Sequence, residues 1–317
     1  MQKAILVLVA MAMLWASAMA QEETAGYWLS KGNESLEQAL NETQNETSRD
    51  LLLQESLDAY NKTVEIDPQS VLGWQKRGRV LFELGRYEES ISCFNRYTMI
   101  APQSAKGWYW KGCILAELGR WQEALEAFNE SLKINPQDDL AWHLESQMLG
   151  ALGRYSQALE ACNESLKINP QDAATWYWKG AMLGDLGRYS QALKAYNESL
   201  KIDPQSSQAW LDKGRALNEL STKNEAKDAF AKVIELDEKA IELNHNDANA
   251  WQRKGWALDL LGRHDAALQC FDKAIEPDPG YCWPWLSKGQ VLQELGRSVD
   301  AEAFFAKARE LGCSSTY

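Results

Sequence analysis

Residues Trp108–Pro136, WYWKGCILAELGRWQEALEAFNESLKINP, decide the fold of this chain. The stretch returns with few changes at Trp176–Pro204, as WYWKGAMLGDLGRYSQALKAYNESLKIDP. A tryptophan opens each of five copies at a constant spacing of 34 residues, namely Trp74, Trp108, Trp142, Trp176 and Trp210. Self-similarity at this period is typical of stacked helical hairpins.

Each copy predicts two helices separated by a tight turn. In each half, apolar or small residues recur every three or four positions, as they do on one face of a helix. Leu118-Gly119-Arg120 separates the halves, and glycine suits the left-handed residue that ends a helix. Asn135-Pro136 closes the copy, because proline cannot continue a helix. The unit is therefore a helix, a turn, an antiparallel helix and a stop.

Further residue types recur at fixed places when the opening Trp is numbered position 4. Gly stands at 8, Leu at 11, Gly at 15, Tyr at 17, Ala at 20, Phe or Tyr at 24 and Pro at 32. This pattern resembles the tetratricopeptide repeat over nearly all of the chain after residue 20. The resemblance implies an all-α fold, a right-handed superhelical solenoid of about eight helix–turn–helix units. It also implies that the two helices of a unit pack closely at Gly112, with Ala124 facing it.

Position 7 departs from the leucine that is usual in the family. It is Arg77, Lys111, Lys179, Lys213, Lys254 or Lys288 in the different copies. A long aliphatic stem can cover apolar surface while its charge reaches water, so this is a tolerated variation. The copy at Trp142 departs further, with Glu145 and Ser146 at positions 7 and 8, and we expect its helices to pack less closely.

Residues 1–20 have the composition of a signal peptide. Lys3 precedes an uncharged run, and Ala18-Met19-Ala20 resembles a cleavage site. We therefore expect an exported protein, located in the periplasm, at the cell surface or outside the cell, without stable membrane insertion after cleavage. An uncleaved membrane anchor is the alternative, although the apolar run is short for a membrane span.

The repeats divide the rest of the chain. Residues 21–68 are expected to form an atypical first repeat with a polar insertion, residues 69–204 four regular repeats, residues 205–247 a repeat with a heptad-extended second helix, residues 248–313 two further repeats, and residues 314–317 a tail. The extension follows from the similarity of residues 231–237 to residues 238–244, since seven residues make close to two helical turns. In the same repeat Ser221 replaces the turn glycine.

Charge and motifs argue against several classes of function. The formal net charge of −12 disfavours nucleic acid and anionic membrane surfaces as partners. The sequence has no nucleophile elbow, phosphate loop or HExxH motif, and no Cys/His cluster with metal-ligand spacing. His264 and His245 stand where other copies have an aromatic residue and a proline, which gives both a structural interpretation. We expect a non-enzymatic protein without metal ion or cofactor.

Seven N-x-S/T sequons are potential glycan acceptors in an exported protein, at Asn33, Asn41, Asn45, Asn61, Asn129, Asn163 and Asn197. The last three are one repeat position copied three times. The pair Asn41 and Asn45 lies in the polar insertion and is more suggestive.

Six cysteines show no regular pairing pattern along the repeats, namely Cys93, Cys113, Cys162, Cys270, Cys282 and Cys313. An even number in an exported chain fits disulfide pairing, whereas free cysteine is also a good small core residue. Cys270 with Cys282 is the pair to test first.

The family resemblance implies that the first helices line a concave groove that holds segments of other proteins. The stripe one residue beyond the inward-facing positions should face this groove. It gives the candidate partner-binding residues Gln75, Arg79, Phe82, Tyr109, His143, Tyr177, Arg215, Gln252 and Trp256. Aromatic side chains with a few polar hydrogen-bonding groups suit a peptide groove. Tyr109 and Tyr177 are equally explained as repeat consensus.

The leading expectation is therefore a scaffold that binds other proteins or peptides. One alternative is a structural or self-assembling cell-surface component. No capping helix is visible after Ala308, so Phe304 and Phe305 are either covered locally or meet a partner or a second copy, which would give self-association through the C-terminal repeat. A second alternative is a carrier for a small ligand or glycan that uses Trp110, Trp178 and Trp256.

Overall fold

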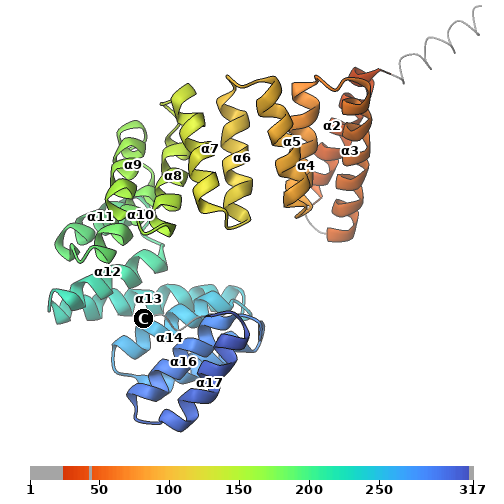
Figure 1. Cartoon of the computed structure of the whole chain (residues 1–317). Coiled ribbons are helices and arrows are strands. Elements are labelled where there is room, and N and C mark those ends of the chain that lie inside the picture. Colours follow the sequence, from red (N-terminus) through yellow and green to blue (C-terminus); the bar gives the residue numbers. More distant parts are fainter. Residues whose placement is uncertain (1–23, 43–44, 314–317) are drawn as a thin grey trace, which may run out of the picture. The chain divides into compact units, whose positions relative to one another are not determined.

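The computed structural model describes residues 24–42 and 45–313, which form sixteen α-helices and contain no strand (Figure 1). The expected signal peptide and the tail at residues 314–317 lie outside the described residues. The chain divides into two compact units, with the boundary between Arg154 and Tyr155. We call them unit 1 and unit 2.

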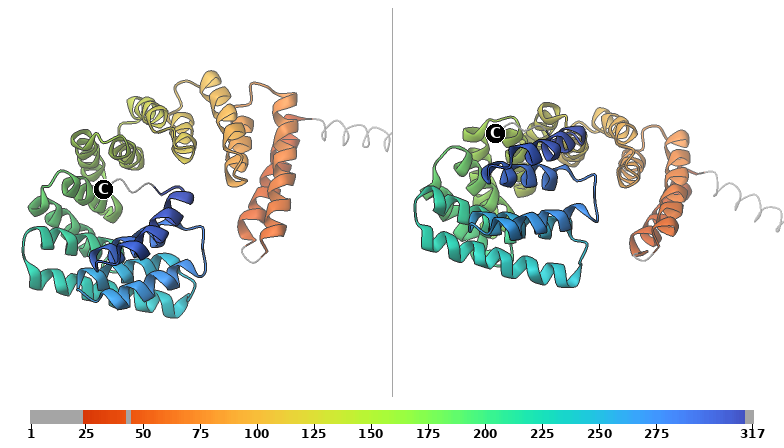
Figure 2. Two further views of the ribbon diagram at one scale, coloured as in Figure 1. Left: turned by 60° about the horizontal axis from the view of Figure 1, so that its bottom comes forward. Right: turned by 90° about the horizontal axis from the view of Figure 1, so that it is seen from below.

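Both units are built from helical hairpins (Figures 1 and 2). Unit 1 contains α2 (Ala25–Asn41), α3 (Glu46–Ile66), α4 (Val71–Glu83), α5 (Tyr87–Ile100), α6 (Ala105–Glu117), α7 (Trp121–Ile134) and α8 (Asp139–Ala151). Unit 2 contains α9 (Tyr155–Ile168), α10 (Ala173–Asp185), α11 (Tyr189–Ile202), α12 (Ser207–Glu219), α13 (Lys223–Leu243), α14 (Ala248–Leu260), α15 (His264–Ile275), α16 (Cys282–Glu294) and α17 (Ser298–Glu310). Within each unit, consecutive helices pack against each other. The expected all-α fold of stacked helix–turn–helix units is confirmed.

Local sequence explains where the helices begin and end. Most first helices begin at a polar side chain that caps the helix, as where Asp247 Oδ1 accepts a hydrogen bond from the Ala250 N–H at 2.9 Å, whereas α6 and α16 have no such cap bond. Six first helices end at the predicted glycine turn, namely α4, α6, α8, α10, α14 and α16. Gly119 has a φ of +69°, and the Arg120 N–H donates to the Leu115 carbonyl at 2.9 Å, which satisfies a carbonyl at the helix end.

The opening tryptophan of a repeat is hydrogen-bonded to the end of the repeat before it. Its indole N–H donates to the backbone carbonyl six residues earlier, at 2.8 to 3.1 Å, in Trp74, Trp108, Trp142, Trp176, Trp210, Trp251 and Trp285. The acceptor is a proline carbonyl except at Trp251, which uses His245. Because the acceptor is a backbone carbonyl, the hydrogen bond is kept at Trp251 although His245 replaces the proline.

The two helices of a repeat approach closely at the position-8 glycine. A Cβ on Gly112 would lie 2.7 Å from the ring of Phe128, and a Cβ on Gly180 would lie 2.5 Å from the ring of Tyr196. Any larger residue would therefore push the helices apart. The expected close packing at Gly112 is confirmed, and the atoms nearest to its Cβ position belong to Phe128 at position 24. Ala124, which was expected to face the glycine, is fully buried.

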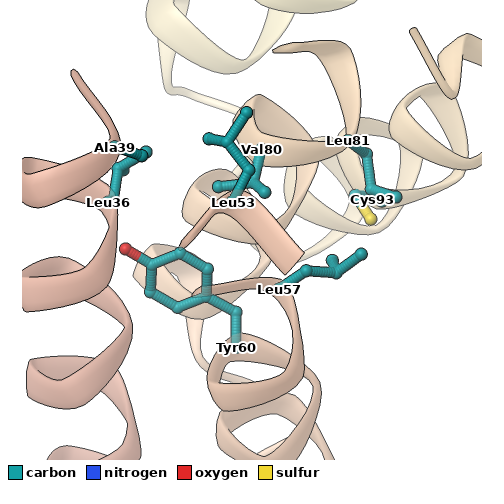
Figure 3. Packing of buried hydrophobic residues seen from close by; sticks show 8 residues of the cluster. All are labelled: Leu36, Ala39, Leu53, Leu57, Tyr60, Val80, Leu81 and Cys93. Atoms are coloured by element: carbon teal, nitrogen blue, oxygen red, sulfur yellow. The ribbon is translucent and has the colours of Figure 1, made fainter. Parts of the chain in front are cut away.

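The core of unit 1 shows how neighbouring hairpins join (Figure 3). Leu36 and Ala39 of α2 and Leu53, Leu57 and Tyr60 of α3 are buried with Val80 and Leu81 of α4 and Cys93 of α5. Each hairpin thus buries its apolar face against the next one, which is how a repeat fold grows without a central core.

Two repeats have longer helices than the others. In the first repeat, α2 has 17 residues and α3 has 21, against 13 in α6 and 14 in α7. The polar insertion therefore lengthens both helices of that hairpin. In unit 2, α13 has 21 residues and includes the duplicated heptad (Figures 1 and 2).

The proposed pairing of Cys270 with Cys282 is wrong. Cys282 forms a disulfide with Cys313, with 5.8 Å between their Cα atoms, and Cys270 is a buried free thiol. The disulfide joins the start of α16 to the residue that follows α17. Phe305 packs against Gly289 and Phe304 lies 5.9 Å from Trp285, so both rings have local cover.

Peptide mapping without reduction tests this pairing. We expect one crosslinked peptide that joins Cys282 to Cys313, and alkylatable thiols at Cys93, Cys113, Cys162 and Cys270 after unfolding in denaturant. A crosslink through Cys270 would contradict the assignment. The Cys313→Ser variant is the control, and its Cys282 should become alkylatable.

Ser221 gives a second test of the fold. It has a φ of 61° at the turn between α12 and α13, where other repeats have glycine. A side chain in this left-handed region costs about 1 kcal/mol, so Ser221→Gly should raise the free energy of unfolding by up to that amount. Gly187 stands at the equivalent position, and a Cβ there would meet no atom within 4 Å. Gly187→Ser should therefore lower the free energy of unfolding by a similar amount. Denaturant unfolding of both variants measures the effect, and equal shifts in the same direction would refute the explanation.

Candidate functional site

The first helices of unit 2 line two neighbouring hollows. The Tyr196 hollow, about 360 Å³, lies among α10, α11 and α12, and its lining includes Asp185, Tyr189, Tyr196, Asp212, Arg215 and Glu219. The Trp256 hollow, about 350 Å³, lies among α12, α14 and the start of α16, and its lining includes Gln208, Asp212, Arg215, Gln252, Trp256 and Trp283. The two hollows share Asp212 and Arg215, so together they form one continuous strip along the first helices.

Asp212 is the centre of a hydrogen-bond network between the hollows. Its Oδ2 accepts from the Tyr177 hydroxyl and from Gln208 Nε2, both at 2.9 Å. Its Oδ1 accepts from Arg215 Nη1 at 3.2 Å. Because one carboxylate holds three neighbours, the polar groups of the strip are held in place before any ligand arrives.

Two contacts hold the Trp256 side chain in place. The Arg215 guanidinium lies 5.0 Å from the centre of its ring, and its indole N–H donates to Ser287 Oγ at 2.8 Å. Arg215 is thus shared between the Trp256 ring and the Asp212 carboxylate. A flat cation stacked on an indole presents its remaining N–H groups in a fixed plane.

Gln252 has a buried amide nitrogen without a partner. Its side chain is 2 % exposed, and no described residue accepts a hydrogen bond from Nε2. Leaving a buried donor unpaired costs about 1–3 kcal/mol. Other atoms of Gln252 line the Trp256 hollow, and a rotation of this side chain would bring the buried Nε2 to an acceptor atom of a bound molecule, which would recover part of this free energy.

The heptad extension of α13 contributes to this site. Asp237 is almost fully buried and accepts from Arg253 Nη2 at 2.7 Å and from the Ser207 hydroxyl at 2.8 Å. Burial raises the pKa of Asp237, and the adjacent Arg253 guanidinium opposes that rise. Arg253 lines the Trp256 hollow, so the longer helix fixes the position of one of its cations.

Unit 1 has related contacts on α4 and α6. The Arg79 guanidinium lies 5.1 Å from the ring of Trp110, and the ring of Phe82 lies 6.2 Å from it. Burial lowers the pKa of Lys76, and the positive charges of Arg79 and Lys106 lower it further. Lys76, Arg79 and Lys106 therefore place three positive charges near one another on α4 and α6.

The sequence-predicted residues differ in exposure. Gln75 and His143 are buried, at 6 % and 9 % exposed. Arg79, Phe82, Tyr109, Tyr177 and Trp256 are half-buried, and Arg215 is exposed. In unit 2 the structure brings Tyr177, Arg215, Gln252 and Trp256 into or beside the hollows.

Several lining residues were missed because they occupy other repeat positions. Gln208 and Trp283 stand at position 2, and Asp212 and Arg253 stand at position 6. One signal was available in the sequence. Position 6 is Trp110 and Trp178 in two regular copies, whereas the copy that starts at Trp210 has an aspartate there.

The cations at position 7 have a role beyond their aliphatic stems. In six repeats the side chain lies 4.6 to 5.4 Å from the ring of the tryptophan three residues earlier, in the pairs Lys31–Trp28, Arg77–Trp74, Lys111–Trp108, Lys179–Trp176, Lys213–Trp210 and Lys254–Trp251. Such stacking contributes about 0.5–1 kcal/mol at an exposed site. The departure from leucine is therefore a recurring cation–π contact.

In the repeat that opens with Trp142, position 7 is Glu145 instead of a cation. Its carboxylate is buried, and Oε2 has no hydrogen-bond partner among the described residues. Burial raises the pKa of Glu145 to about 7, although the charge of Arg154 acts in the opposite direction. A perturbed carboxyl group can mark a catalytic site, but here it stands at a structural repeat position, so we interpret it as a destabilising substitution.

The described residues offer little support for a catalytic cysteine or a metal site. Burial raises the pKa of the Cys93 thiol to about 11 and that of Cys113 to about 12, which keeps both protonated at neutral pH. Asp259, His264 and Glu294 could each offer one metal ligand, with the ligand atoms within 4.8 Å of one another. His264 Nδ1 and Asp259 Oδ1 are 2.8 Å apart across the turn between α14 and α15, which gives that pair a structural role.

The sequons differ in their surroundings. Asn129, Asn163 and Asn197 are exposed on second helices, but the serines of these sequons, Ser131, Ser165 and Ser199, are buried. Asn33 accepts a hydrogen bond from the Tyr60 hydroxyl at 2.8 Å, and Asn61 Oδ1 is buried. Asn41 and Asn45 are exposed at the facing ends of α2 and α3.

Sequence comparison identifies repeats along most of the described chain. Models described as "Tetratricopeptide repeat" match residues 73–104, 105–138, 140–172, 173–206, 207–244 and 248–281. No curated protein matches the chain. None of the helices in the described ranges has the length and hydropathy needed to cross a bilayer.

Solved structures share the fold at low sequence identity. A tetratricopeptide repeat protein from Parabacteroides merdae has a TM-score of 0.63 at 14 % identity, covering 83 % of this chain and 99 % of its own. Yeast Tom70 has a TM-score of 0.62 at 13 % identity, covering 90 % and 61 %. YrrB, described as having "an unusual peptide-binding site", has a TM-score of 0.51 at 16 % identity, covering 68 % and 99 %.

Glu145 makes the stability of the protein depend on pH. The folded-state pKa of about 7 lies above the ordinary value of 4.5, so folding favours the protonated carboxyl. This contribution is present below pH 4.5 and is lost as the pH rises through 7, at a cost on the order of 3 kcal/mol. Glu145→Gln should therefore have a melting temperature above that of the wild type at pH 8, and the difference should shrink at pH 5. A difference that does not change with pH would contradict the assignment.

Proposed function

Because the chain belongs to the tetratricopeptide repeat family, we propose that it is a non-enzymatic scaffold that binds a polypeptide segment along the first helices of unit 2. The observation that carries this proposal is the unpaired Gln252 amide in the Trp256 hollow. A peptide backbone offers a carbonyl acceptor at every residue, so a bound peptide can accept that hydrogen bond.

The rest of the Trp256 hollow suits an extended peptide. Trp283 is exposed at its edge and offers a flat apolar surface, while Asn249 is held by a hydrogen bond from the Tyr281 hydroxyl at 2.9 Å. Aromatic anchors beside fixed polar groups are typical of peptide sites. Because the network around Asp212 is already formed, little side-chain freedom is lost on binding, which favours affinity.

The location that we propose is outside the cytosol. The first 20 residues have the composition of a signal peptide, and the Cys282–Cys313 disulfide suits an oxidising compartment. If the host glycosylates exported proteins, Asn41 and Asn45 are the favoured acceptors because both are exposed at helix ends.

Peptide binding can be separated from stability at Gln252. Selection from a displayed random-peptide library on the purified chain should enrich a defined set of peptides. The Gln252→Met variant keeps a similar side-chain volume and removes an amide that has no hydrogen-bond partner among the described residues, so its melting temperature should not fall. Its affinity for the enriched peptides, measured by fluorescence polarisation, should fall about tenfold, because a hydrogen bond to a buried group is lost.

The matched control is Gln75→Met, at the same repeat position in unit 1. It should leave the affinity unchanged. A library without enriched peptides, or a Gln252→Met variant with wild-type affinity, would overturn the proposal.

A further inference from the structure

The hydroxyl group of Tyr196 lies in the Tyr196 hollow without a hydrogen-bond partner among the described residues. The side chain is 4 % exposed. Tyr60 occupies the same repeat position in the first repeat, and its hydroxyl donates to Asn33 Oδ1 at 2.8 Å. Other repeats have a residue without a hydroxyl there, as in Phe94, Phe128, Phe230, Phe271 and Phe305. Packing therefore does not require the Tyr196 hydroxyl, and a ligand would explain it.

The same hollow has an excess of negative charge. Asp185, Asp212 and Glu219 line it, and Arg215 is the one cation of its lining. Arg215 is already engaged by the Asp212 carboxylate and the Trp256 ring. Asp185 and Glu219 are exposed and have no ion-pair partner in the described part of the chain. Burial raises the pKa of Asp185, and the nearby negative charge of Asp212 raises it further, as expected for a carboxylate that lacks a cation.

Small residues form part of the wall of the hollow. Ala181, Gly184 and Ala216 line it with small side chains. A Cβ on Gly184 would lie 3.7 Å from the Tyr196 hydroxyl oxygen, so the glycine keeps the space before that hydroxyl open. Tyr189 and Tyr196 add aromatic rings, whose faces attract cations. Carboxylates, a hydroxyl and aromatic rings around an open space match an ammonium or guanidinium group.

We propose that the Tyr196 hollow receives the cationic side chain of a Lys or Arg residue of the bound peptide. The cation would donate hydrogen bonds to the exposed carboxylates of Asp185 and Glu219 and to the Tyr196 hydroxyl oxygen, which has no partner among the described residues. The peptide main chain would then pass over Asp212 and Arg215 to the Trp256 hollow, because the two hollows share these residues. This inference rests on the proposed function and adds the class of peptide: one with a basic residue next to the segment that Gln252 contacts.

A position-scanning peptide library tests the inference. The probes are fluorescein-labelled heptapeptide pools in which the central residue is fixed and the others are random. Pools with central Lys or Arg should bind the purified full chain at least about tenfold more tightly than pools with norleucine, Gln or Glu, and the preference should weaken at 0.5 M salt.

Two variants assign the preference to this hollow. Tyr196→Phe introduces the residue that other repeats use, so its melting temperature should match that of the wild type while the preference for Lys and Arg falls several-fold. The double variant Asp185→Asn, Glu219→Gln should abolish the preference, measured as the ratio of the affinities for the Lys and norleucine pools. Asp265→Asn, an exposed carboxylate on α15 outside the hollow, is the matched control and should change neither.

The outcomes separate this inference from the proposed function. Pools that bind without preferring Lys or Arg, or a preference that survives the double variant, would overturn the inference and leave peptide binding intact. Failure of every pool to bind would overturn both. A free diamine, cadaverine, that binds more tightly than the Lys pool would show that the hollow takes a small amine instead of a peptide side chain.

Discussion

The contact between the position-8 glycine and the aromatic ring at position 24 constrains the rest of the structure. It sets the distance between the two helices of a repeat, since a Cβ on the glycine would overlap the ring, as at Gly214 and Phe230. That distance decides which side chains of the first helix reach the surface. The Tyr196 hollow depends on it directly, because the ring that fills the space at Gly180 belongs to Tyr196.

The repeat fold could be predicted from the sequence because its signals are local and repeated many times. A glycine turn, a proline stop and a period of 34 residues each restrict the chain within one hairpin. The disulfide could not be predicted in this way. Cys282 and Cys313 are 31 residues apart, and their proximity depends on how α17 packs back on α16, which spacing alone does not show.

The candidate site could be predicted only in part. The sequence places the groove on the first helices, and Arg215 and Trp256 do line a hollow there. It could not show that Gln75 and His143 are buried, because the surface that a helical side chain covers depends on its direction and on the neighbouring helix. Asp212 was missed for a related reason. Its importance comes from three partners on two helices, which no single repeat position reveals.

In seven repeats, the hydrogen bond from the opening indole to the carbonyl six residues earlier connects one repeat to the next within a single short segment of chain. If a stretch of one full period is duplicated or deleted, this connection therefore stays intact, provided that the ends of the stretch do not fall within those six residues. The chain can consequently gain or lose repeats in evolution, or by design, without the need to invent a new interface. Variation is left free to accumulate on the exposed faces of the first helices, where recognition of different partners can change while the framework stays the same.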